Sequence, residues 1–193
     1  MKIKRTGAFI ILLIFVLIAV GLYMYLREPA PPVDPGEEYE VQLYFSTPDA
    51  MYLDREKRTV SGQDFYKNVL NELIIGPTEE NLSKTIPETG GVLNIEHDRD
   101  KESLIVNFNE EWQRDHWGGS AGERLTIYSV VNTMTSLPEV ERVGFRVEGQ
   151  QVETLAGHMD LTAEYQYSED LVLQEEAQDV EQEEFEVEIE ESD

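Results

Sequence analysis

Hydrophobic and polar residues alternate along several stretches of the chain, as they do in strands with one buried face. The clearest case is residues 40–46, where Val41, Leu43 and Phe45 share one face. The predicted strands are residues 40–46, 51–60, 92–96, 103–109, 140–147 and 152–155. Residues 92–96 and 103–109 are expected to form an antiparallel pair across a charged turn.

Two other stretches have the period of an amphipathic helix. In residues 61–75, hydrophobic residues recur every three to four positions, and Gly76-Pro77 ends the pattern. A second stripe comprises Ile127, Val130, Val131, Met134 and Leu137, in a helix expected to begin near Ser120. The order is roughly β(β)αββαββ, which predicts a small single α+β domain with two helices packed on one sheet.

The first 28 residues have a different character. Basic residues 2–5 precede a mostly apolar run over residues 8–26, long enough to span a membrane. Acidic residues follow it, which predicts a cytoplasmic N-terminus and an extracytoplasmic domain. A cleaved signal peptide is the alternative, since small residues stand at 19–21.

We therefore expect four parts: a cytoplasmic stub and transmembrane anchor (1–28), a proline-rich linker (29–38), the domain (39–167) and an acidic disordered tail (168–193). The tail has two interpretations, a partner-binding segment or a solubilising one.

The formal net charge of the chain is −25. Nucleic-acid binding depends on neutralising phosphates with Lys and Arg, so this charge argues against a nucleic-acid partner. The chain has no cysteine, which excludes disulfides and a lipid-modified N-terminal cysteine.

One segment invites a catalytic interpretation. Residues 118–122 fit the G-x-S-x-G pattern of hydrolase nucleophiles, with Ser120 at its centre. His116 and His158 are the possible bases for Ser120. The preceding residues do not form a hydrophobic strand, and the acids do not follow in the usual order.

The same segment also fits a structural role. Ser120-x-x-Glu123 is a capping box, in which Ser120 and Glu123 bond each other's backbone N–H. The glycines Gly118, Gly119 and Gly122 would let the chain turn into the helix. We favour this role, in which no residue of the segment is catalytic.

Gly157, His158 and Asp160 form a second polar group. His158 and Asp160 stand on alternate positions, so both side chains could face one metal ion. A zinc site needs three or four protein ligands, and histidine is sparse in this chain. We therefore predict no metal and no cofactor, and a polar strand end bonded to local backbone.

Residues 39–172 resemble the GerMN domain. The resemblance rests on an ordered series: VQLYFSTPDAMYLDREKRTV, ELIIGPTEENLSKTIP, SLIVNFNEEW, GSAGERLTIYSVVNTMTSLPEVERVGFRVEG and VETLAGHMDL. It implies a role in sporulation and spore germination and a fold related to ring-building modules. Many GerMN proteins are lipoproteins and some carry two copies of the domain, whereas this chain has neither feature.

The resemblance also implies a function class. It indicates a non-catalytic, single-pass membrane protein that acts as an interaction or assembly module. The implied partners are proteins of a sporulation or cell-envelope assembly, with a second copy of this chain among them. Two alternatives stay open: a cell-wall-associated hydrolase and a peptidoglycan-binding accessory protein, although no residue specifically indicates peptidoglycan.

Overall fold

The computed structural model describes residues 13, 15 and 37–174. The chain divides into two compact units, residues 1–31 and 32–193. The predicted anchor lies outside the described residues apart from Leu13 and Phe15, and the acidic residues from 175 onward also lie outside them. Within the described part, no helix combines the length and the apolar composition needed to cross a membrane.

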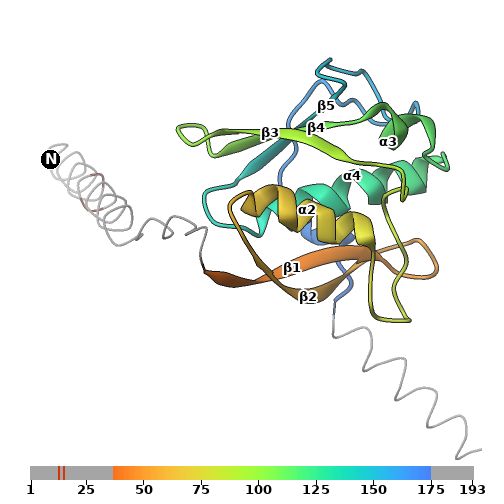
Figure 1. Ribbon diagram of the computed structural model, residues 1–193, viewed down its shortest axis with the longest axis horizontal. Coiled ribbons are helices and arrows are strands. Elements are labelled where there is room, and N and C mark those ends of the chain that lie inside the picture. The colour runs from red at the N-terminus through yellow and green to blue at the C-terminus, as the bar shows by residue number, and fades with distance from the viewer. Residues whose placement is uncertain (1–12, 14, 16–36, 175–193) are drawn as a thin grey trace, which may run out of the picture. The chain divides into compact units, whose positions relative to one another are not determined.

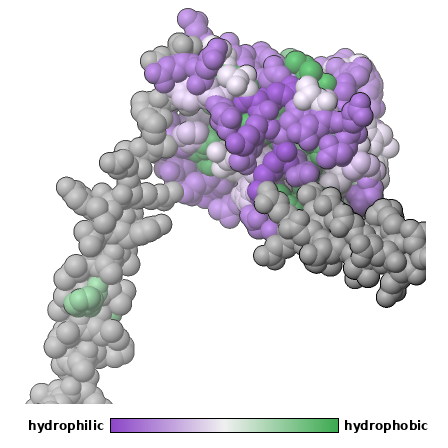
Figure 2. Space-filling model, turned by 90° about the horizontal axis from the view of Figure 1, so that it is seen from below, coloured by the Kyte–Doolittle hydropathy of each residue, from purple (hydrophilic) through white to green (hydrophobic). Residues whose placement is uncertain are grey.

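The domain begins with an antiparallel hairpin of β1 (Glu38–Ser46) and β2 (Leu53–Ser61), as the alternation predicted. Val41, Leu43 and Phe45 are buried on its inner face. This hairpin lies at the bottom of Figure 1, and Figure 2, which views the molecule from below, shows a mainly hydrophilic surface. The hairpin therefore has one face on the core, and its other face meets water except near Tyr44 and Leu53, which pack with Leu125 and Val172.

A second sheet has the order β3-β4-β5. Its strands are β3 (Val92–Asp98), β4 (Ser103–Phe108) and β5 (Arg142–Val147). β3 and β4 are antiparallel, whereas β4 and β5 are parallel. β4 is buried along most of its length because it has a neighbour on each side, and β3 is an exposed edge strand.

The helices α2 (Phe65–Ile75) and α4 (Ser120–Thr135) lie between the two sheets (Figure 1). Each contacts strands of both sheets. α2 ends at Gly76, as predicted, where the backbone takes a φ of 98° that favours glycine. The predicted apolar stripe of α4 is confirmed, since Ile127, Val130 and Met134 are completely buried.

Polar residues of α4 are buried as well, because the helix has a neighbour on every side. The Thr133 hydroxyl accepts a hydrogen bond from the Tyr44 N–H of β1 at 3.1 Å. The Asn132 amide donates to the Ser168 carbonyl and accepts from the Ser168 N–H, at 3.1 and 2.9 Å. These side chains tie α4 to the first strand and to the C-terminal segment.

Three predictions about the fold are wrong in detail. The strands form two sheets, so the helices do not pack on one sheet. Residues 152–155 form no strand, because a loop after the turn at Gly149 covers the start of α4 instead. The folded part continues beyond residue 167 through the short 3₁₀ helix Glu169–Leu171, and Leu171 and Val172 are buried.

Candidate functional site

The start of α4 brings most of the predicted site residues together, but not as a capping box. Gly118 and Gly119 have φ values of 76° and 81°, which favour glycine, and Gly119 is the N-cap residue. The Glu123 N–H donates to the Gly119 carbonyl at 2.9 Å, and no side chain caps the helix. The predicted reciprocal bonding of Ser120 and Glu123 is therefore wrong, since Ser120 is exposed and the Glu123 carboxylate points elsewhere.

The Glu123 carboxylate is fully buried beneath the loop of residues 153–161. It accepts hydrogen bonds from the backbone N–H groups of Leu155, Ala156, His158 and Met159, at 3.1, 2.9, 2.8 and 3.3 Å. His158 Nδ1 also lies 2.9 Å from one carboxylate oxygen. Burial opposes ionisation, but the hydrogen bonds from this loop outweigh it and hold the pKa of Glu123 below its usual range.

His158 and Asp160 do not converge on one point. His158 faces Glu123, whereas Asp160 Oδ1 accepts from the Thr162 N–H and hydroxyl at 2.9 and 2.6 Å. The Thr162 bonds lower the pKa of Asp160. Gly157 has a φ of 96°, and its N–H donates to the Thr154 hydroxyl. These residues shape the loop, and no group of three or more acidic or histidine side chains in the described part is placed to hold a metal ion.

His116 is bonded through both ring nitrogens. Its Nδ1 accepts from the Gly118 N–H at 3.0 Å, and its Nε2 lies 3.0 Å from the Thr126 hydroxyl. That hydroxyl donates to the Thr85 carbonyl at 2.6 Å, so it must accept a hydrogen bond from the Nε2–H of His116. Burial lowers the pKa of His116, which favours this neutral, Nε2-protonated form.

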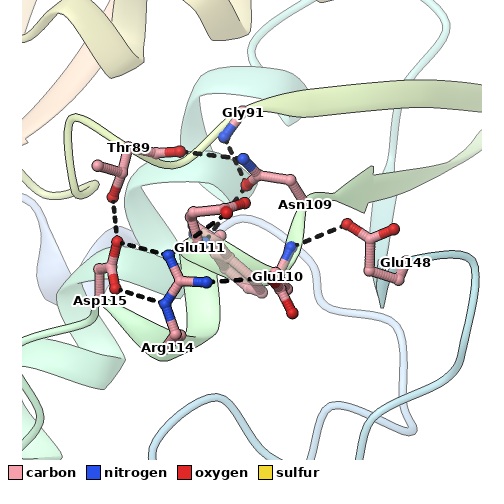
Figure 3. Close-up of polar contacts among 9 residues, drawn as sticks. Thr89, Gly91, Asn109, Glu110, Glu111, Arg114, Asp115 and Glu148 are labelled. Atoms are coloured by element: carbon pink, nitrogen blue, oxygen red, sulfur yellow. Dashed lines mark hydrogen bonds and ion pairs between the residues drawn. The ribbon is translucent and has the colours of Figure 1, made fainter.

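Sequence reasoning missed the helix α3 (Glu110–Arg114) and the network around it (Figure 3). Asn109 caps α3 by accepting from the Trp112 N–H, and it also accepts from the Gly91 N–H and donates to the Thr89 carbonyl. The signal was present, because Asn before two acidic residues is a typical helix start. The helix places Trp112, a fully buried side chain, in the core.

Charged side chains surround the same helix. Arg114 pairs with Glu110, Glu111 and Asp115, and Asp115 accepts from the Thr89 hydroxyl at 2.7 Å. Figure 3 shows these groups facing one another rather than an open site. Exposed ion pairs contribute about 0–1 kcal/mol each, so this network positions loops more than it stabilises the fold.

A second buried carboxylate, also missed, lies in β2. Glu56 accepts from Arg58 Nε at 2.6 Å, from the Thr78 N–H and hydroxyl, and from the Glu79 N–H. Burial opposes its ionisation, but these bonds outweigh it and lower the pKa of Glu56. Arg58 also pairs with Glu72 of α2 at 2.7 Å, so the cluster joins β2, α2 and the loop after Gly76.

At the start of α4, Ser120 is not hydrogen-bonded to a base in the described structure. In the described residues Ser120 bonds neither His116 nor His158. Both ring nitrogens of His116 are bonded to other groups, and His158 is held through its Nδ1 by Glu123. A serine nucleophile needs a base within hydrogen-bond reach. What the residues do chemically is fix one loop and one helix start by buried, charge-assisted hydrogen bonds.

Two solved structures share the fold. The tandem GerMN domains of the sporulation protein GerM from Bacillus subtilis match with a TM-score of 0.56 and 16% identity, covering 66% of this chain and 45% of that chain. The first GerMN domain of the same protein matches with a TM-score of 0.52 and 16% identity, covering 68% of this chain and 98% of that chain. No match was found among curated proteins.

The family assignment rests on a match to a family model. The Germane model, described as sporulation and spore germination, matches residues 42–153, more than half of the chain. The matched span runs from β1 to the first residue of the loop that Glu123 holds, and it includes the whole of α4. The chain therefore belongs to the Germane family of sporulation and spore germination, and its described domain has the GerMN fold.

Proposed function

We propose that this protein is a non-catalytic interaction module of sporulation or spore germination, held at the outer side of a membrane by its N-terminal apolar segment. One observation carries the proposal: the side chains that suggest chemistry are engaged in holding the fold. Glu123 anchors the 153–161 loop, and His116 bonds Thr126 and Gly118. No hydrogen bond joins either imidazole to Ser120 in the described residues.

The edge of the three-stranded sheet supports an interaction role. β3 has no strand partner on its outer side within the described residues, whereas Tyr165 bonds the outer side of β5 through two backbone hydrogen bonds with Val143. An open edge offers backbone N–H and C=O groups to an extended segment of a partner protein. We assign the partner contact to this edge.

A groove beside β3 would accommodate the side chains of such a segment. It has a volume of about 540 Å³ and lies between β3 and the start of α2, with Tyr66, Leu93 and Ile95 among its lining residues. Leu93 is 44% exposed at a bulge in the strand. Exposed apolar groups of this kind are common at protein interfaces.

The test compares two substitutions of exposed apolar residues. Leu93→Glu places a charge at the β3 groove, and Ile75→Glu places the same charge at the end of α2, where Ile75 is 61% exposed. Each full-length variant is expressed in a spore-forming host that depends on the protein. We expect Leu93→Glu to reduce the yield of germinating spores by about tenfold or more, on the scale of a lost interface anchor, and Ile75→Glu to leave it unchanged.

Protein level and thermal unfolding of both variants serve as controls for folding. If Leu93→Glu supports normal sporulation and germination at a normal protein level, the β3 edge is not the partner site.

A further inference from the structure

A second surface, at the start of α4, carries an exposed aromatic ring in a fixed position. Trp117 is 55% exposed, and its ring stacks on His116 with centroids 5.1 Å apart and planes at 21°. Gly122 lies directly beneath, since a Cβ there would stand 2.9 Å from the indole nitrogen. A ring held in this way loses little conformational entropy when a ligand stacks on it.

A cavity of about 130 Å³ opens beside Trp117. Its lining combines hydroxyl residues with apolar side chains: Ser46, Thr47, Ser83, Thr85 and Thr126 with Pro48, Ala50 and Leu125. None of the described residues that line it is acidic, and its lysine, Lys84, pairs with Glu88. The cavity thus offers both hydroxyl and apolar groups and is close to neutral in a strongly acidic protein.

One hydroxyl of the lining has no protein partner. Thr85 is 1% exposed, and its Oγ1 makes no hydrogen bond within the described structure. Buried polar side chains are nearly always bonded, so this hydroxyl calls for an explanation. The neighbouring Thr126 hydroxyl is already engaged, because it donates to the Thr85 carbonyl and accepts from His116.

We propose that this cavity is a subsite for an N-acetylated amino sugar, with the acetamido group in the cavity and the sugar ring on Trp117. The carbonyl oxygen of the acetamido group would accept from the Thr85 hydroxyl, and its methyl group would lie against Leu125. The apolar C–H face of the sugar would stack on the indole, which joins an apolar face to a polar N–H.

The size of the cavity supports placing the acetamido group inside it and the sugar ring outside it. Its volume equals roughly four water molecules at about 30 Å³ each, which is room for an acetamido group but not for a sugar ring as well. Sites that enclose a whole ligand occupy about 300–1,000 Å³. The site goes beyond the interaction role proposed above and does not depend on it.

The test is a titration of the isotopically labelled full chain, in a detergent without sugar headgroups, with N,N′-diacetylchitobiose. Cellobiose, the same disaccharide frame without acetamido groups, is the matched control. We expect saturable chemical-shift changes at the Trp117 indole N–H and at the Thr85 and Thr126 amides with diacetylchitobiose only. Absence of saturation, or equal affinity for cellobiose, would overturn the assignment.

Three variants locate the site. Gly122→Ala displaces the indole through the close Cβ contact, and Thr85→Val removes the hydroxyl while keeping the shape, so we expect each to weaken binding several-fold or more. Trp117→Ala, at an exposed position, repeats the first test without altering the backbone of α4. Leu93→Ala, on the β3 edge, should bind as the parent does. Unchanged affinity in Gly122→Ala, Trp117→Ala and Thr85→Val would contradict the proposal even if the sugar binds.

Discussion

At the scale of single residues, Glu123 shows how a buried charge serves structure. An ionised carboxylate in a protein interior is tolerated only when its oxygens are well bonded. Here four backbone N–H groups and one imidazole nitrogen surround it. The carboxylate therefore fixes the backbone of a loop that begins where the sequence predicted a strand over residues 152–155, and Leu155 is the residue that the two share.

The Glu123→Gln variant tests this role. The NH₂ group of the glutamine would face N–H donors from which it cannot accept a hydrogen bond, so we expect a loss of about 1–3 kcal/mol in the free energy of unfolding at pH 7. Because the folded-state pKa of Glu123 is lowered, its contribution is present above the unfolded value of about 4.3 and is lost as pH falls through the folded pKa. The stability difference between parent and variant should accordingly shrink in acid.

Urea unfolding of the full chain, followed by tryptophan fluorescence at pH 7 and pH 3, measures both effects. Glu110→Gln is the control, because Glu110 is an exposed carboxylate in a surface ion pair. A Glu123→Gln variant as stable as the parent at pH 7, or a difference that grows in acid, would show that the carboxylate does not hold the loop.

At the scale of elements, the periodic parts were predictable and the non-periodic parts were not. The hairpin, α2, the β3–β4 pair and β5 follow directly from alternation or helical spacing. α3 is too short to show a period, and its only signal is the cap at Asn109. The capping box at Ser120 failed because Glu three residues after Ser fits two geometries, and only the folded loop decides which one forms.

The two helix starts give opposite predictions. Asn109→Ala removes a side chain that caps α3 and bonds residues 89 and 91, so we expect it to cost about 0.5–2 kcal/mol. Ser120→Ala removes no cap in the described structure, and alanine is a good helix former, so we expect a change below about 0.5 kcal/mol. Thermal unfolding of both variants beside the parent makes the comparison. A larger loss of stability for Ser120→Ala than for Asn109→Ala would indicate that the capping box at Ser120 forms after all.

At the scale of the whole molecule, the α+β class was predictable from the sequence, but the arrangement of two sheets with helices between them was not. Strand patterns identify which face is buried, but they do not state which strands pair, so two sheets were taken for one. The buried polar residues of α4 hold the clue, because Asn132 and Thr133 bond elements on either side of the helix. In the sequence of an amphipathic helix, such polar residues are expected on the solvent-exposed face. Their hydrogen-bond partners also lie far away in the sequence, so the pattern does not reveal that they are buried.

The same limit applies to the candidate site. Sequence reasoning identified the residues at the start of α4 and assigned them a structural role, but it missed what they hold. It could not locate Trp117 beside Thr85, since these residues come from separate segments. Their proximity follows only from the packing of α4 against the end of β1 and the loop after α2.

We propose that this domain acts by contact and that Ser120 is not a nucleophile. The most direct measurement is the yield of heat-resistant, germinating spores from a host whose only copy of the protein carries Ser120→Ala. We expect a spore yield equal to that obtained with the parent protein at an equal protein level. Removing a true nucleophile lowers turnover by about 10³-fold or more. A collapse of the spore yield with the variant folded and abundant would therefore show that Ser120 has a catalytic role.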